Sequence, residues 1–417
     1  MNQPNLTQPN LTLADPAAHG FDAGRLDRIG AFLEERYIAP GLLPHADLLI
    51  ARGGQPIHRL TLGKARADGT PLAQDALFRI ASMTKALTSM AFMMLLEEGK
   101  VALDDPVTKV IPEFAGLGIY NGGGGDAPFF PTRAATNPMR MVDLLTHMSG
   151  LTYGIQNRTN VDAAYRKGRL DGHPSLASND HFIAELAKLP LEFDPGTGWN
   201  YSVSTDVLGV IVARLSGMSL GEFFASRIFA PLGMVDTGFH CPPEKAHRLT
   251  DSWAWTPMGA PVLIDHAEKS NTLRAPRFES GGGGLLSTTA DYHRFCAALA
   301  NGGAPLISPK TLALMTANHL PGGADLTTLS RALFSEAGNA GIGFGLGFGV
   351  VVDPAKTLVP GTKGEFHWGG IHSTAFFVDP IEKLHMVFMT QLLPSSAYPI
   401  RRQLKTLVYA AMTHSHA

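Results

Sequence analysis

The sequence is poor in cysteine and nearly balanced in charge. Only Cys241 and Cys296 occur among its 417 residues, and their number and separation predict neither a disulfide framework nor a zinc site. Lys and Arg number 34 against 36 Asp and Glu, so the formal net charge is −2. This balance provides no basic surface for a nucleic acid or an anionic membrane, and we expect neither partner.

The sequence also lacks the segments that direct a chain into or across a membrane. No run of about 18 apolar residues occurs, so no membrane span is predicted. The opening MNQPNLTQPNLTLADPAAHG has neither a basic start nor an apolar stretch, and therefore does not resemble a signal peptide. We expect a loose N-terminal tail over residues 1–20 and a cytoplasmic protein. The sequence does not indicate the oligomeric state.

Strand and helix patterns divide the chain into parts of different character. An apolar stripe over residues 22–36 predicts a helix, and two strand-like runs flank Gly53 and Gly54, which is a hairpin signal. Residues 103–279 are rich in proline, glycine and short helical patterns, whereas strand-like runs return near the C-terminus. Beyond the tail we therefore predict a sheet domain built from both chain ends, with a mostly helical domain inserted between them: residues 21–105 with 285–417, and residues 106–284.

The stretch FRIASMTKALTSM, residues 78–90, places Ser82 and Lys85 at i and i+3 in an otherwise mostly apolar segment. On a helix these two side chains share a face and can meet. A serine hydroxyl attacks when a base takes its proton, and a desolvated amine can serve as that base. Backbone N–H groups at a helix start help to stabilise an oxyanion. The pattern indicates a serine nucleophile, although S-x-x-K arises by chance about once in a chain of this length.

Two further segments strengthen this interpretation. PGTGWNYSVS, residues 195–204, leads from a Pro-Gly turn to Tyr201 and into a predicted helix, and EFHWGGIHS, residues 365–373, interrupts a strand pattern with two glycines. Glycine inside a strand often marks a close approach to a ligand. With connecting segments such as DLLTHMSGL and GGGGLLSTTADYHRF, these motifs resemble the penicillin-recognising serine hydrolases: class C β-lactamases, D-alanyl-D-alanine peptidases and especially family VIII carboxylesterases.

The resemblance implies a fold and a set of residue roles. The implied fold is α/β (α+β) and β-lactamase/transpeptidase-like, with a mainly antiparallel sheet flanked by helices. Ser82 is implied as the acylated nucleophile, with Lys85 and Tyr201 as proton carriers, and either of these two could be the general base. The backbone N–H groups of Ser82 and Ile371 are implied as the oxyanion hole.

Two positions depart from the β-lactamase pattern and bear on the substrate. The segment that matches Trp368-Gly369-Gly370 usually begins with a lysine in β-lactamases and peptidases, and the position of Val203 usually holds an asparagine. We expect Trp368, Gly369, Gly370 and Val203 to bind the substrate. Because a cation and an amide are replaced by apolar surface, we predict a serine carboxylesterase that cleaves small neutral esters.

Several alternatives stay open at this point. The same fold could carry a β-lactamase, a D-amino-acid peptidase or amidase, or an acyltransferase, and a catalytically dead binding domain is a less favoured possibility.

Ser219 matches the G-x-S-x-G elbow, but it follows a predicted helix and precedes Glu222 by three residues, which predicts a capping box. The 16 histidines form neither H-E-x-x-H nor a cluster with ligand spacing, so we expect no metal and no cofactor. Alternating glycines over residues 341–349 predict one strand with a bare face.

Overall fold

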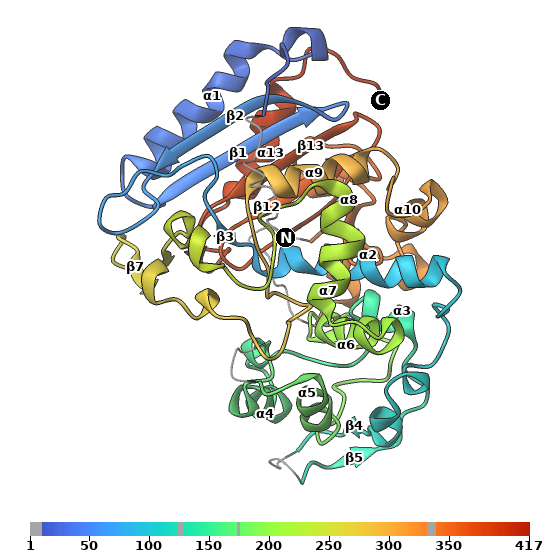
Figure 1. The fold of residues 1–417 in the computed structure, drawn as a ribbon. Helices are drawn as coiled ribbons and strands as arrows, with labels where there is room; N and C mark the ends of the chain where they lie inside the picture. Colours follow the sequence, from blue (N-terminus) through green and yellow to red (C-terminus); the bar gives the residue numbers. More distant parts are fainter. Residues whose placement is uncertain (1–10, 124–128, 173–175, 332–338) are drawn as a thin grey trace, which may run out of the picture.

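A seven-stranded sheet forms the centre of the computed structural model, which describes residues 11–123, 129–172, 176–331 and 339–417. All of its neighbouring strands pair antiparallel, in the order β2-β1-β13-β12-β11-β10-β9. The hairpin near the N-terminus therefore lies beside strands near the C-terminus (Figure 1). The strands are β1 (His45–Arg52), β2 (Gln55–Gly63), β9 (Ile342–Phe344), β10 (Gly349–Val351), β11 (Phe366–Gly369), β12 (Ala375–Asp379) and β13 (Leu384–Met389).

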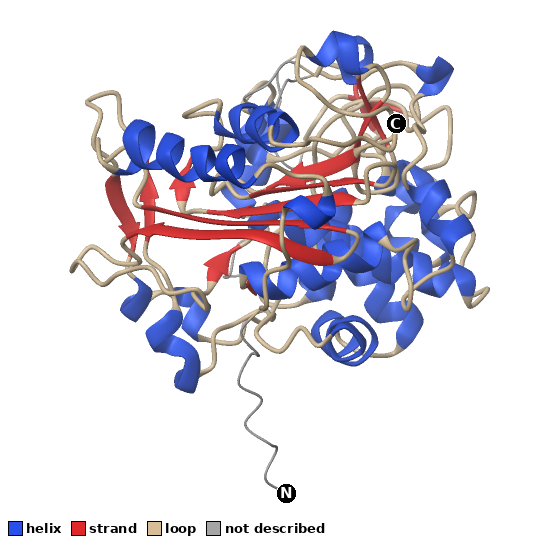
Figure 2. Cartoon of the chain, turned by 90° about the horizontal axis from the view of Figure 1, so that it is seen from above, coloured by secondary structure: helices blue, strands red, loops and turns tan. Residues whose placement is uncertain are grey.

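Helices cover both faces of this sheet, as Figure 2 shows. On one face lie α1 (Ala23–Leu33) and α13 (Ile400–Ala410). Each buries an apolar stripe with helical spacing, such as Ile400, Leu404 and Val408 of α13. On the other face lie α2 (Thr84–Glu97) and α9 (Thr289–Ala300). Helix α2 is buried nearly all round, so the helix expected to follow Ser82 lies in the core.

The middle of the chain is largely helical, and Figure 1 shows these green segments beside α2 and below the sheet. The division into domains stays a prediction. The remaining helices are α3 (Met141–Leu145), α4 (Asn160–Gly168), α5 (Asn179–Leu186), α6 (Ser204–Ser216), α7 (Leu220–Phe224), α8 (Ala230–Leu232), α10 (Pro309–Met315), α11 (Leu326–Leu329) and α12 (Pro354–Thr357). The remaining strands are β3 (Phe78–Arg79) with β8 (Leu286–Ser287), β4 (Ile119–Tyr120) with β5 (Thr132–Arg133), and β6 (Ser252–Ala254) with β7 (Val262–Asp265) and β14 (Leu392–Leu393).

A helix that spans a membrane is about 20 residues long and predominantly apolar. Within the described ranges no single helix is long and apolar enough to cross a membrane. The segments Ser204–Ser216 and Leu220–Leu232, bent by 78° relative to each other, pass together by length and composition only.

Local rules explain several element boundaries. Ser219 precedes α7 and forms the predicted capping box: its Oγ accepts from the Glu222 N–H at 3.1 Å, and the Glu222 carboxylate accepts from the Ser219 N–H at 2.8 Å. Helix α6 comes before it, so the strand that a nucleophile elbow requires is absent at this position. The expectation of one strand over residues 341–349 was wrong, because two short strands, β9 and β10, pair with each other there. A side chain on Gly345 or Gly347 would overlap α10 or α2, so the glycines let this hairpin turn against both helices.

The described part of the expected N-terminal tail contacts the rest of the molecule. Residues 1–10 lie outside the described residues. The Ala14 N–H donates to the Pro56 carbonyl at 2.8 Å, and the His19 carbonyl accepts from Arg52 at 3.0 Å. Residues 14–20 therefore pack against the hairpin of β1 and β2.

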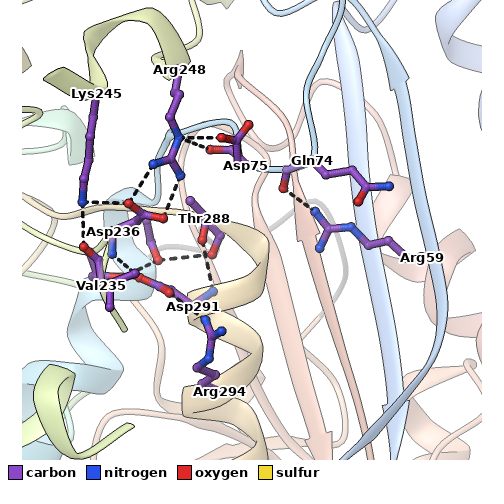
Figure 3. A network of polar contacts seen from close by, with 12 residues as sticks. Arg59, Gln74, Asp75, Val235, Asp236, Lys245, Arg248, Thr288, Asp291 and Arg294 are labelled. Carbon is purple, nitrogen blue, oxygen red and sulfur yellow. Dashed lines mark hydrogen bonds and ion pairs between the residues drawn. The ribbon is translucent and has the colours of Figure 1, made fainter. Parts of the chain in front are cut away.

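A polar network fastens the short β3–β8 pair that leads into Ser82 (Figure 3). Arg248 donates to the Asp75 carbonyl before β3 at 2.8 Å, and its guanidinium donates to both carboxylate oxygens of Asp236 at 2.8 and 2.7 Å. The Asp236 N–H donates at 2.7 Å to Asp291, which follows β8 in the first turn of α9. These charge-assisted bonds tie both strands to one loop and hold the approach to Ser82 in place.

Candidate active site

Ser82 lies in a tight turn between β3 and α2. The residue before it, Ala81, has a φ of 46°, a left-handed conformation that costs a non-glycine residue roughly 1–2 kcal/mol. Ser82 is half-buried and lines a cavity of about 180 Å³. The fold thus places the predicted nucleophile on a strained turn at the wall of a cavity.

Lys85 lies one turn further along and is only 1% exposed. Its Nζ donates to the Gly282 carbonyl at 2.7 Å and to the Tyr153 hydroxyl at 2.9 Å. These two hydrogen bonds hold the amine in place. Buried hydrogen bonds of this kind offset the cost of removing the amine from water.

Two tyrosine rings flank the Lys85 amine. Its Nζ lies 4.6 Å from the ring centre of Tyr201 and 5.3 Å from that of Tyr153, and the two ring centres are 5.3 Å apart. Burial, followed by the nearby Asp206 carboxylate, raises the pKa of the Tyr153 hydroxyl well above its usual range. Tyr153 therefore keeps its proton at neutral pH and holds the Lys85 amine as a neutral partner.

Asp206 lies near Tyr153 and Lys85, in the first turn of α6, and is 1% exposed. Its carboxylate accepts from the Ser280 hydroxyl at 2.5 Å and from the Gly282 N–H at 3.0 Å. Burial raises the pKa of Asp206, while the charge of Lys85 acts in the opposite direction. Gly282 is required here because a side chain would overlap the Asp206 carboxylate. The buried Lys85 amine and the buried Asp206 carboxylate thus bind the C=O and the N–H of the same glycine residue.

Sequence reasoning missed Tyr153 and Asp206. Tyr153 follows the DLLTHMSGL segment by two residues, and nothing in its spacing connects it with Lys85. Asp206 carried a weak signal, because it is an acidic residue at the start of an otherwise apolar helix. A carboxylate in that position needs a buried partner, but the sequence did not identify Lys85 as that partner.

Aromatic side chains form one wall of the cavity. Trp368 lies at the end of β11, with its ring centre 5.5 Å from that of Tyr201 and 5.4 Å from that of Phe344. Trp199 stacks on Tyr201 with a centre distance of 6.2 Å. The same cavity is lined by Ser82, Tyr201, Trp368, Gly369, Gly370 and Ile371. The structure therefore brings most of the predicted site residues to one place.

The turn after β11 approaches the Ser82 turn closely. A Cβ on Gly370 would lie 2.5 Å from the Ile80 carbonyl oxygen and 3.2 Å from the Ala81 Cβ, so only glycine fits. Among the described residues, neither the Ser82 N–H nor the Ile371 N–H donates a hydrogen bond to the protein. Two open donors therefore occur in the two turns that meet at this cavity.

Val203 stands apart from the other predicted residues. It is fully buried at the start of α6 and lines neither the Ser82 cavity nor the neighbouring one. We therefore leave Val203 out of the candidate site.

His147 is also buried, and its ring lies 4.9 Å from that of Tyr201, which indicates a packing role. In the described ranges no group of three or more His, Cys, Asp or Glu side chains could hold a metal ion.

Comparison with known proteins decides the family. The family model described as Beta-lactamase matches residues 32–410. The chain belongs to the beta-lactamase family. The match spans the sheet, the helical middle and the Ser82 turn, so the predicted resemblance to this superfamily and its β-lactamase/transpeptidase-like fold is confirmed.

Relatives in the beta-lactamase family include esterases and acyltransferases. Esterase EstB of Burkholderia gladioli is 31% identical over 422 residues, covering 95% of this chain and 98% of that protein. Acyltransferase calJ of Penicillium decumbens is 33% identical over 399 residues, covering 91% and 90%. The solved structure "EstCE1, a hydrolase with promiscuous acyltransferase activity" aligns with a TM-score of 0.77 and 26% identity, covering 93% of this chain and 98% of that one. The protein is thus an enzyme of the β-lactamase-fold hydrolase family.

Proposed function

We propose that this protein is a serine carboxylesterase that cleaves small neutral esters through an acyl-enzyme on Ser82. The observation that carries the proposal is the buried Lys85 amine, hydrogen-bonded to Tyr153 and packed on the Tyr201 ring, one helical turn from a serine that lines an aromatic-walled cavity. This arrangement supplies a nucleophile, proton carriers and room for an acyl group. We also propose that the protein is most similar in function to the family VIII carboxylesterases.

In the proposed reaction, Ser82 Oγ attacks the ester carbonyl carbon and its proton passes to the Lys85–Tyr201 pair. The carbonyl oxygen becomes an oxyanion that the open N–H groups of Ser82 and Ile371 stabilise. The bond to the alcohol then breaks, and the alcohol leaves with the proton from the pair. Water attacks the acyl-enzyme by the same route, which releases the acid and restores Ser82. Either Lys85 or Tyr201 could be the general base.

Selectivity for neutral esters follows from the charges around the cavity. Trp368 replaces the lysine that holds a substrate carboxylate in β-lactamases and peptidases, and its indole offers an apolar face with one N–H donor. Losing a charge-assisted hydrogen bond of this kind costs about 1.5–3 kcal/mol. An anionic lactam therefore binds roughly ten- to a hundredfold more weakly than it would beside a lysine, whereas a neutral ester gains apolar contact.

Cations do line the far part of the cavity, but each is engaged within the protein. The Lys405 Nζ lies 2.7 Å from Glu365 Oε1, Arg401 donates to the Gly370 carbonyl at 2.7 Å, and Arg402 donates to the Thr357 carbonyl at 3.3 Å. These contacts do not use all the donors of an ammonium or a guanidinium. The proposed preference for a substrate without charge therefore rests on Trp368, and not on these three cations.

The test compares two chromogenic substrates with the purified protein. We expect a higher kcat/KM for nitrophenyl butyrate than for a chromogenic cephalosporin, and no turnover of either by Ser82→Ala. Intact mass after reaction with a fluorophosphonate should show one adduct, absent from Ser82→Ala. A better cephalosporin substrate would replace the esterase proposal with a β-lactamase, and full esterase activity in Ser82→Ala would overturn the acyl-enzyme mechanism.

Acyl transfer to an alcohol is a second candidate function. A neighbouring cavity is lined by Ala81, the residue before Ser82, and by Arg274 and His372 among others, and we propose that it receives the acceptor alcohol. The relative Acyltransferase calJ is named for this activity, and EstCE1 is described as a hydrolase with promiscuous acyltransferase activity. The test adds a primary alcohol during hydrolysis and measures ester product by chromatography. Product that stays at the level of the Ser82→Ala control would exclude this function.

A further inference from the structure

Helix α13 begins with an electrostatic contradiction. Its first three residues are Ile400, Arg401 and Arg402, and its first turn has no acidic residue. The N-terminus of a helix carries a partial positive charge, so cations there are unfavourable. Residues that break such a local rule are expected where a contact elsewhere requires them.

Arg401 makes that contact with the turn after β11. Its Nη2 donates to the Gly370 carbonyl at 2.7 Å and to the Thr374 carbonyl at 2.9 Å. The Gly370 carbonyl also accepts from the Ser373 N–H at 3.0 Å, and the Gly370 N–H donates to the Thr374 carbonyl at 2.9 Å. The guanidinium therefore joins both ends of the turn that contains Ile371.

The Gly370–Ile371 peptide turns this contact into an effect on the site. A trans peptide is planar, and its C=O and N–H point in opposite directions. Holding the Gly370 oxygen toward Arg401 therefore points the Ile371 N–H the other way, away from α13. A cation on the carbonyl also polarises the peptide, which makes its N–H a stronger donor.

The two glycines of this segment separate Arg401 from the nucleophile. A Cβ on Gly369 would lie 2.5 Å from the guanidinium carbon of Arg401, whereas a Cβ on Gly370 would lie 2.5 Å from the Ile80 carbonyl beside Ser82. Gly369 thus admits the arginine from one side, and Gly370 admits the Ser82 turn on the other. One pair of residues explains both approaches.

We propose that Arg401 is a positioning residue that orients and polarises the Ile371 N–H as an oxyanion donor, an inference that rests on the proposed function. Although Arg401 lines the cavity, in this role it acts through the Gly370 carbonyl and not through contact with the substrate. The buried stripe of α13 holds its backbone against the sheet. Helix α13 lies on one face of the sheet, whereas Ser82 precedes α2 on the other face. In this proposal the C-terminal helix helps to stabilise the transition state across the sheet.

The test uses Arg401→Met, Arg401→Lys and the matched control Arg25→Met, whose arginine lines neither cavity and also donates to a main-chain carbonyl, that of Ala410 at the end of α13, at 3.0 Å. Deleting an oxyanion donor lowers kcat about 10²–10³-fold, so misorienting one in Arg401→Met should lower kcat roughly tenfold to a hundredfold. We expect KM for nitrophenyl butyrate to change by less than about threefold, because the interaction strengthens in the transition state. Arg401→Lys should recover part of the loss, and Arg25→Met should stay near wild type.

Two further readouts separate this role from a structural one. The inhibition constant of a trifluoromethyl ketone, whose serine adduct carries an oxyanion, should rise by the factor by which kcat falls. The rate of Ser82 labelling by a fluorophosphonate should fall in parallel. A folded Arg401→Met with wild-type kcat, inhibition constant and labelling rate would overturn the inference, as would an equal loss in Arg25→Met. Should Arg401→Met not fold, Arg401→Gln is measured against the same outcomes.

Substrate contact by Arg401 is the rival explanation. In that case Arg401→Met would raise KM for an anionic ester, nitrophenyl hemisuccinate, and leave the neutral butyrate unaffected. That result would overturn the positioning role. A wild-type protein that is labelled at Ser82 but hydrolyses no ester would contradict the proposed function alone, and slower labelling of Arg401→Met would still support the inference.

Discussion

Replacing Tyr153 with phenylalanine tests the buried group around Lys85 most directly. The change removes one oxygen atom, the acceptor of the 2.9 Å bond from Lys85 Nζ. It leaves the ring in place, and it leaves the second bond of Lys85, to the Gly282 carbonyl, intact. The amine therefore loses one of its two fixed contacts and gains freedom to rotate.

The expected loss follows from the energy of that bond. A hydrogen bond to a charged group contributes about 1.5–3 kcal/mol, and each 1.36 kcal/mol of lost transition-state stabilisation is about tenfold in rate. We expect Tyr153→Phe to lower kcat/KM for nitrophenyl butyrate by roughly ten- to a hundredfold. Because the raised pKa of Tyr153 keeps it protonated, the variant should keep the shape of the pH–rate profile near neutrality.

The control is Tyr165→Phe, which removes another fully buried tyrosine hydroxyl that lies near the Thr152 backbone. Initial rates at several substrate concentrations give kcat and KM for both variants, and urea unfolding gives their stability. We expect similar losses of stability but an activity loss only in Tyr153→Phe. Equal activity losses in the two variants, or wild-type activity in Tyr153→Phe, would refute the reasoning.

Three further outcomes are expected. Lys85→Ala and Tyr201→Phe should each lower kcat by several orders of magnitude, and the double variant should lose little more, since residues that act as a unit are strongly non-additive; losses that multiply would show separate steps. Ser219→Ala should keep kcat within a few-fold and reduce the free energy of unfolding by at most about 1 kcal/mol, because it removes only a helix cap; abolished turnover in a folded variant would return Ser219 to the mechanism. Burial lowers the pKa of His293 to about 4, so the unfolded chain binds a proton near pH 6.5 that the folded state takes up only near pH 4, and stability is lost as the pH falls through this window. Since the raised pKa of Asp47 acts in the opposite sense, the measurement compares urea unfolding of wild type and His293→Gln at pH 7, 6 and 5; the variant should lose less stability, by up to about 1.4 kcal/mol per pH unit, and equal losses would count against the histidine.

Local patterns predicted the parts of the fold that depend on neighbouring residues. The pair Gly53-Gly54 fixed the hairpin of β1 and β2, and the Ser219–Glu222 spacing gave the helix cap. Alternation misled at residues 341–349, because glycines that looked like one bare strand face serve as close contacts around a turn. Periodicity does not show which neighbour will fill the space beside a glycine.

In the candidate site too, local motifs were predicted from the sequence, whereas contacts between distant segments were not. The motifs located Ser82, Lys85, Tyr201 and Trp368. In the structure Ser82, Tyr201 and Trp368 line one cavity, and the Lys85 amine packs on the Tyr201 ring. Tyr153, Asp206 and Arg401 were not predicted, because each contributes through a partner far away in the sequence. Val203 was expected at the substrate, yet the start of α6 turns it into the core, an orientation that depends on how the helix packs.

The strand order has a consequence for the chain as it is synthesised. Strand β1 needs β13 as its inner neighbour, and the ion pair between Arg52 and Glu382 beside these strands spans 330 residues. Such distant pairing forms late, because the intervening chain must first be made and ordered. Ser82 emerges from the ribosome long before the turn at Gly370 that completes its cavity. The growing polypeptide therefore carries Ser82 without its complete cavity throughout translation, and the proposed esterase activity begins only when the last strands and α13 have joined the sheet.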